Sequence, residues 1–245
     1  MPLMKYAGVT INYEEFGSGY PLVLFAPGSL NSTIKAWHKL ATIDPTAEFA
    51  DQFRVIAMDQ RNSGDSFATM SMQDGWHSYT ADHIALLDHL GIERAHIAGQ
   101  CIGAPFCFSL MKAQPARVSA AVLIQPSGRM GPFPGPTIYF DKWANGLQNH
   151  PEATPELVRQ FALNLYTPDF VWSVTRDFVK NCRIPMLVMR GNDPYHPPEV
   201  SAEIVRLAPD VEDITDWQEG EARQAAIRRM REFMLKHVPA GVAAR

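Results

Sequence analysis

The chain has 245 residues, of which 46% are hydrophobic, and its formal charge is −4 at pH 7. This length favours one compact domain with a large core. Lysine and arginine form no basic stripe, which argues against nucleic acid and anionic membranes as partners and leaves a small-molecule substrate as the expectation.

The N-terminal sequence and the cysteines indicate the compartment. Residues 1–12 lack a basic segment followed by an apolar run of signal-peptide length, and no stretch of about 18 apolar residues occurs. The three cysteines are an odd number without metal-ligand spacing, which argues against a disulfide framework and a zinc site. We therefore expect a cytoplasmic protein with at least one free thiol, and the sequence leaves its oligomeric state open.

Short apolar runs alternate with stretches of helical period, a pattern typical of α/β proteins with a mostly parallel sheet and helices on both faces. An antiparallel hairpin is expected first, at residues 8–16 and the glycine-rich turn 17–19. Strands are then predicted at residues 21–26, 54–59, 95–99, 120–125, 186–190 and 211–215. The clearest helices are predicted at residues 80–90, 105–113 and 221–237.

Residues 129–180 interrupt this alternation. A turn-rich segment at 131–136 (GPFPGP) precedes helical pieces that carry aromatic residues, namely Trp143, Phe161, Tyr166, Phe170 and Trp172. We expect an inserted helical lid that covers one end of the sheet, with residues 1–128 and 181–245 as the two parts of the core. The alternative is that the aromatic side chains only pack the insertion onto the core.

Residues 95–107 (AHIAGQCIGAPFC) predict a buried strand that runs into a helix through a G-x-C-x-G turn. Such a turn forces its central residue into strained backbone geometry, and the flanking glycines remove side chains that would collide. Cys101 would then project freely at a helix N-terminus, where unpaired N–H groups favour the thiolate. The alternative is a small buried hydrophobic residue in a glycine-rich turn.

Four other segments match motifs of one superfamily: residues 25–29 (FAPGS), 58–66 (MDQRNSGDS), 82–91 (DHIALLDHLG) and 191–197 (GNDPYHP). Over nearly its whole length the chain resembles the α/β-hydrolases, which place there an oxyanion strand, a D-x-R-G-x-G-x-S loop, a helix and an acid-bearing turn. The last turn is one residue shorter here. The elbow cysteine is similar to that of dienelactone hydrolases, whereas the rest is closer to the short-lid esterase and C–C hydrolase branch. The resemblance implies an α/β-hydrolase fold with a small helical lid.

The resemblance assigns roles to four residues. Cys101 would attack an electron-poor carbonyl, and the oxyanion would accept hydrogen bonds from the backbone N–H groups of Ile102 and Ser29. Asp193, after the strand at 186–190, would be the orienting acid at the carboxyl end of the sheet, where ligands collect. Ser29 could equally be an ordinary turn residue.

The histidine of this superfamily follows the last strand, but residues 211–221 (VEDITDWQEGE) contain none. Trp217 occupies roughly the expected place, and His237 lies near the end of the last helix. His196, three residues after Asp193, is the strongest substitute, with a capping or surface role as the alternative. His77 is a second candidate, in a loop that also follows a strand.

A cysteine tolerates a displaced histidine better than a serine does, because a thiol at a helix N-terminus ionises more readily. The expected pocket lies beneath residues 129–180 and is bounded by aromatic and histidine side chains: Trp76, His77, Phe106, Trp143 and Phe170. Arg61 and Asn62 either anchor a substrate carboxylate or brace their loop.

These features predict a hydrolase that cleaves an activated ester, enol lactone or thioester of a small molecule through a Cys101 acyl-enzyme. No cofactor or metal is implied, because no phosphate-binding glycine loop or ligand cluster occurs. Two alternatives stay open. One is a lyase, a C–C hydrolase or a cofactor-free oxygenase, because the fold does not choose among them. The other is a non-catalytic binding protein derived from a hydrolase.

Overall fold

The structure is a computed structural model that describes residues 2–132, 135, 137–168 and 170–241. Within these residues, eight strands form one sheet in the order β1-β2-β4-β3-β5-β6-β7-β8. The strands are β1 (Leu3–Tyr6), β2 (Val9–Phe16), β3 (Tyr20–Phe25), β4 (Phe53–Met58), β5 (Ala95–Gln100), β6 (Val118–Ile124), β7 (Met186–Met189) and β8 (Val211–Ile214).

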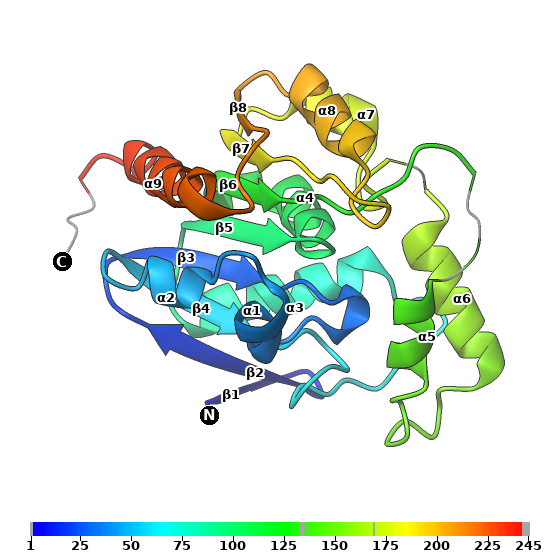
Figure 1. The fold of residues 1–245 in the computed structure, drawn as a ribbon. Helices are drawn as coiled ribbons and strands as arrows, with labels where there is room; N and C mark the ends of the chain where they lie inside the picture. The colour runs from blue at the N-terminus through cyan, green and yellow to red at the C-terminus, as the bar shows by residue number, and fades with distance from the viewer. Residues whose placement is uncertain (1, 133–134, 136, 169, 242–245) are drawn as a thin grey trace.

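The helices alternate with these strands as the sequence predicts, and Figure 1 shows them on both faces of the sheet. They are α1 (Ile34–Leu40), α2 (Pro45–Glu48), α3 (Trp76–His89), α4 (Gly103–Ala113), α5 (Ile138–Ala144), α6 (Pro155–Tyr166), α7 (Arg176–Asn181), α8 (Pro198–Leu207) and α9 (Gly220–Lys236), with short 3-10 turns at Ser29–Asn31 and Pro115–Arg117. The predicted α/β architecture is confirmed. Strand and helix ends differ from the predictions by a few residues.

The predicted N-terminal hairpin is wrong in its pairing. One edge of β2 pairs antiparallel with the preceding strand, β1. Its other edge pairs antiparallel with β4 rather than with β3. The glycine turn at 17–19 packs against the segment before β4: a Cβ atom at Gly17 would lie 1.9 Å from the carbonyl oxygen of Ala50. This close packing places β4 between β2 and β3.

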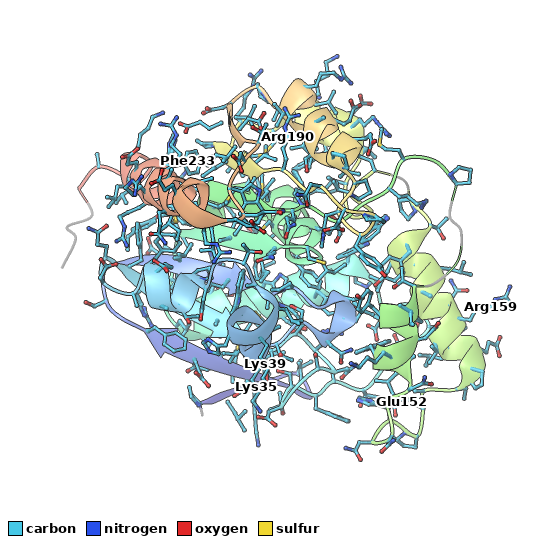
Figure 2. The ribbon with its side chains drawn as sticks, in the orientation of Figure 1. Lys35, Lys39, Glu152, Arg159, Arg190 and Phe233 are labelled. Atoms are coloured by element: carbon cyan, nitrogen blue, oxygen red, sulfur yellow. The ribbon has the colours of Figure 1, made fainter. Side chains whose placement is uncertain are left out.

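The parallel strands are buried on both faces because successive side chains point to opposite sides of a sheet. On β3, Phe25 faces the cluster with α3 and α4, whereas Leu24 faces the cluster with α1 and α9. Phe233 of α9 lies buried in the second cluster, while Lys35 and Lys39 are exposed on α1 (Figure 2). Two continuous cores therefore hold the sheet rigid.

Residues 129–180 contribute α5, α6 and α7; residues 133, 134 and 136 of the turn-rich segment lie outside the described residues. Figure 1 shows α5 and α6 beyond the carboxyl ends of the parallel strands. Hydrogen bonds fasten this segment to the core: the Glu152 carboxylate (Figure 2) accepts one from the Met70 N–H at 2.9 Å, and the Trp143 indole donates one to the Asn62 carbonyl at 2.9 Å. The segment therefore has a fixed position above the strand ends.

Candidate active site

Cys101 lies in the turn between β5 and α4 with a φ angle of 59°, a strained conformation for a residue with a side chain. The turn is too tight for side chains at its flanks. A Cβ atom at Gly99 would lie 2.2 Å from the Gly103 carbonyl oxygen, and one at Gly103 would lie 2.0 Å from the Phe25 carbonyl oxygen. The predicted elbow therefore exists as a physical structure.

The Cys101 side chain is partly exposed and lines a cavity of about 400 Å³. The Ile102 N–H, at the start of α4, interacts with the sulfur atom. The alternative of a cysteine packed among core side chains is thus wrong for Cys101. It describes the other two cysteines, since Cys107 and Cys182 are buried and burial raises the pKa of each thiol.

Asp193 and His196 lie in the same loop, between β7 and α8. Nδ1 of His196 lies 2.8 Å from Oδ2 of Asp193, and Oδ1 accepts hydrogen bonds from the backbone N–H groups of Tyr195 at 2.8 Å and His196 at 3.0 Å. Burial opposes the charge on Asp193, but the hydrogen bond to His196 and its positive charge hold the pKa of the carboxyl below its usual value. The carboxylate therefore orients the imidazole and fixes Nδ1 as the protonated nitrogen.

The second ring nitrogen of His196, Nε2, is the one available to Cys101. Nε2 of His196 is buried and makes no hydrogen bond of regular geometry within the described residues. The side chains of His196 and Cys101 nevertheless line the same cavity and interact electrostatically. Burial alone would lower the pKa of His196, yet the Cys101 sulfur and the Asp193 carboxylate raise it to about 9. Burial likewise opposes the thiolate, but His196 lowers the Cys101 pKa below its usual value. The site favours a thiolate–imidazolium pair.

Trp217 lies after β8, where the superfamily places its histidine, and it has a structural role. Trp217 is 1% exposed, packs in the core cluster with α9, and its indole N–H donates to the Arg190 carbonyl at 2.9 Å. The next residue, Gln218, exchanges two amide hydrogen bonds with Asn192, at 2.9 and 3.0 Å. The loop after the last strand thus braces the Asp193 loop instead of presenting a histidine.

Ser29 follows β3, the strand beside β5, and lines the same cavity as Cys101. Gly28 has a φ angle of 113° and Ser29 one of 55°, so the chain turns sharply after β3 and both residues line the cavity. The Ser29 hydroxyl lies 3.4 Å from the Tyr166 hydroxyl. Ser29, Cys101 and Ile102 thus line one cavity, and the role of Ser29 and Ile102 as oxyanion donors stays a prediction.

The expected pocket boundary is wrong: none of the five residues predicted for it lines the Cys101 cavity, namely Trp76, His77, Phe106, Trp143 and Phe170. His77 is exposed at the start of α3. The four aromatic residues are buried in packing. For example, the Trp76 indole donates to the Leu165 carbonyl at 3.0 Å. For Trp143 and Phe170, which belong to the insertion, the alternative that such aromatics pack the insertion onto the core is the one that the structure supports.

Other aromatic residues line the cavity. Tyr139, Tyr166 and Trp172 come from residues 129–180, and Tyr195 comes from the Asp193 loop. Ser127, after β6, also lines it. The rings of Tyr139 and Tyr195 meet edge to face, 5.1 Å apart between centroids. Three of these aromatics, Tyr139, Tyr166 and Trp172, lie in the predicted insertion, but the sequence does not indicate which aromatic side chains turn toward the sheet and which toward the cavity.

Arg61 braces its loop. Its guanidinium donates to both carboxylate oxygens of Asp82, at 2.7 and 2.8 Å, and lies 3.5 Å from Asp74. Asn62 accepts a hydrogen bond from the Ala68 N–H at 2.7 Å. Neither residue lines the Cys101 cavity, so the bracing alternative is the one that the structure supports.

The described residues contain no group of three or more histidine, cysteine or acidic side chains arranged to hold a metal ion. None of the helices in the described part of the chain has the length and apolar character needed to cross a bilayer.

A family model described as alpha/beta hydrolase fold matches residues 21–171. The chain therefore belongs to the α/β-hydrolase fold family, as the sequence motifs predicted. A meta-cleavage product hydrolase from Pseudomonas fluorescens, solved in complex with acetates, has this fold with a TM-score of 0.73 and 20% identity, over 96% of this chain and 98% of that one.

Two curated relatives match over shorter segments. A soluble epoxide hydrolase of a Corynebacterium species is 34% identical over 101 residues, which are 41% of this chain and 32% of the relative. A 2-hydroxymuconate semialdehyde hydrolase of a Pseudomonas species is 32% identical over 129 residues, 50% of this chain and 42% of the relative. The matches thus span less than half of these relatives.

Proposed function

We propose that this protein is a hydrolase that cleaves an activated ester, enol lactone or thioester of a small molecule through a Cys101 thiolate and an acyl-enzyme. One observation carries the proposal. A partly exposed cysteine at a strained elbow faces a cavity beside a histidine that a carboxylate orients at 2.8 Å. Nucleophile, base and orienting acid in this order are the parts that acyl transfer requires.

Acylation begins from the thiolate–imidazolium pair. The sulfur of Cys101 attacks the carbonyl carbon, a C–S bond forms, and the π electrons move to the carbonyl oxygen. The Ser29 and Ile102 N–H groups would donate to that oxyanion. When the oxyanion collapses, the bond to the leaving group breaks, and Nε2 of His196 gives its proton to the leaving atom.

Deacylation returns the site to its starting state. Neutral His196 takes a proton from water, the water oxygen attacks the thioester carbon, and the second tetrahedral intermediate expels the Cys101 thiolate. The products are the free carboxylic acid and a restored thiolate–imidazolium pair. Asp193 stabilises the imidazolium in both halves of the cycle.

The cavity supports a small substrate. A volume of about 400 Å³ lies toward the lower end of ligand pockets, and several wall residues are aromatic. Because the thiolate is itself a good leaving group, the tetrahedral intermediate partitions toward products more readily when the other group also leaves easily. Enolates, phenolates and thiolates leave more easily than amide nitrogens, which must first be protonated.

The three cysteines are unpaired, which supports a reducing, cytoplasmic location. The acidic net charge supports a small molecule, rather than nucleic acid or membrane, as the partner.

The test is trapping of the acyl group. The protein is mixed with p-nitrophenyl acetate, quenched in acid and digested, and the mass of the peptide that contains Cys101 is measured. A gain of one acetyl group on Cys101, absent from Cys101→Ser, is expected together with steady release of p-nitrophenolate. A binding protein without catalytic function would give neither signal, and that result would reject the proposal.

A further inference from the structure

Ser127 touches the sulfur atom of Cys101. The two atoms Oγ and Sγ lie 3.1 Å apart, and the serine is 4% exposed on the wall of the Cys101 cavity. Nothing in the motifs around the elbow indicates this residue, because it lies 26 positions further along the chain. It reaches the sulfur because β5 and β6 are neighbouring parallel strands whose carboxyl ends meet.

The backbone fixes this contact. The Ser127 N–H donates to the Cys101 carbonyl at 3.1 Å, and the Cys101 N–H donates to the Ile124 carbonyl at 2.9 Å. On the far side, a Cβ atom at Gly128 would lie 2.1 Å from the Phe170 carbonyl oxygen, so the chain is held closely there too. The Ser127 hydroxyl therefore has a fixed position relative to the elbow.

The direction of the hydrogen bond follows from the ionisation state of the cysteine. A thiolate carries no proton, so the hydroxyl must be the donor whenever Cys101 is anionic. The sulfur is the one hydrogen-bonding partner of the Ser127 hydroxyl within the part of the chain that the structure describes. No carbonyl oxygen competes for its proton there.

We propose that Ser127 is a further catalytic residue, whose hydroxyl donates to the Cys101 sulfur each time that the sulfur is anionic. This inference rests on the proposed function. The sulfur loses its charge when the C–S bond forms and regains it when the thioester intermediate breaks that bond and returns the electron pair. Ser127 therefore stabilises the resting thiolate and the thiolate leaving group of deacylation, but opposes the attack that begins acylation.

Other titratable groups face the sulfur as well. His196 and Asp193 come from the loop after β7, Tyr166 from α6 and Tyr139 from α5. The two tyrosines stay neutral, because burial raises the pKa of Tyr166 and the neighbouring Tyr195 raises that of Tyr139, and the charge of Cys101 adds to both shifts. His196 still supports the thiolate when Ser127 is changed, so the serine can be removed without abolishing the ion pair.

The experiment measures the pH dependence of alkylation of Cys101 by iodoacetamide in wild type, Ser127→Ala and Thr42→Ala. Thr42 lines the same cavity, so its variant reports any general effect of cavity polarity. Cys101→Ser gives the background from the two buried thiols. The apparent pKa of Cys101 is expected to rise by about one unit in Ser127→Ala, because a hydrogen bond to a charged group contributes about that much. It should stay unchanged in Thr42→Ala.

Turnover gives a second readout. With p-nitrophenyl acetate, Ser127→Ala should exceed the wild-type burst rate above the thiol pKa, because the hydroxyl no longer opposes the attack. It should lose about tenfold in steady-state rate, because deacylation expels a less stable thiolate. An unchanged alkylation pKa in Ser127→Ala, or an equal shift in Thr42→Ala, overturns the role of Ser127 and leaves the acyl-enzyme proposal standing. A wild-type Cys101 that resists alkylation at every pH overturns the acyl-enzyme proposal itself, and the role of Ser127 with it.

Discussion

A Cβ atom at Gly191 would lie 2.2 Å from the carbonyl oxygen of His196 and 2.6 Å from its Cβ atom. The loop that carries Asp193 thus folds back so closely that its first and last parts touch. This contact fixes where the backbone of His196 lies relative to the end of β7.

Gly191→Ala should therefore displace His196. Separations of this kind do not occur with real Cβ atoms, and a misplacement of about 1 Å can cost about 100-fold in rate. We expect kcat/KM for p-nitrophenyl acetate to fall by about that factor. Gly75→Ala is the matched control, because the nearest atom to its Cβ would lie at an ordinary 3.6 Å. Full activity in Gly191→Ala would show that the loop relaxes without moving the histidine.

The two candidate histidines can be separated by mutation. His196 lines the cavity and bonds to Asp193, whereas His77 is exposed and lies outside it. His196→Ala should lower turnover of p-nitrophenyl acetate by about 100-fold or more, the usual contribution of a general acid–base. His77→Ala should be close to wild type. The reverse pattern in steady-state rates would remove His196 from the mechanism.

The rate should depend on pH with two limbs. Since the pKa of Cys101 lies below its usual value and that of His196 is about 9, kcat/KM should rise as the thiol ionises and fall as pH passes about 9. The two apparent values belong to the coupled pair. In His196→Gln the thiol loses its cationic partner, so the acidic limb should move to higher pH. A profile that is identical in both proteins would contradict the ion pair.

Stability should fall in acid because of His83. This residue is fully buried, and burial followed by the Arg61 charge lowers its pKa to about 3. In the unfolded chain His83 gains a proton near pH 6.5, whereas in the folded protein it stays neutral down to about pH 3, so unfolding becomes easier as pH falls between these values. The contribution between pH 7 and pH 5 is about 2 kcal/mol.

His83→Gln tests this linkage. A glutamine keeps a donor for the hydrogen bond that joins Nε2 of His83 to the Gln60 side chain at 2.8 Å, but it does not titrate. Urea unfolding at pH 7 and pH 5 should show a loss of free energy that is smaller by about 2 kcal/mol in the variant than in wild type. Equal losses in both proteins would mean that folding does not change the pKa of His83.

The Arg61–Asp82 pair should be essential for stability. The Asp82 side chain is fully buried and that of Arg61 is 8% exposed, so removal of one partner leaves a buried charge unpaired. Arg61→Ala should reduce the free energy of unfolding by about 3 to 5 kcal/mol in urea denaturation. Arg54→Ala, which removes a surface pair with Glu15, should cost less than about 1 kcal/mol. Similar losses would show that burial does not distinguish the two pairs.

The sequence predicted the sheet and the elbow because both depend on local signals. Fully buried parallel strands appear as apolar runs, and Gly99 and Gly103 mark a turn that no other residue fits. The pairing of Asp193 with His196 could also be predicted, since the two residues are close in the chain. The contact of Ser127 with Cys101 could not be predicted, because it depends on which strands are neighbours in the sheet. The prediction of the pocket-lining residues failed for a similar reason, because a run of aromatic residues does not specify which of them face a cavity. Trp143 and Phe161, for example, pack against each other with 5.4 Å between ring centroids.

The placement of Asp193 and His196 on one short turn makes the proposed acid and base a single structural unit. Their mutual contact depends only on residues of this turn, whereas their position relative to the sulfur depends on how the turn is anchored. Within the described residues, none beyond β8 lines the Cys101 cavity, so insertions there should be tolerated as long as Trp217 and Gln218 keep their hydrogen bonds. A graft of residues 191–197 would then transfer the proton-handling part of the site in one piece.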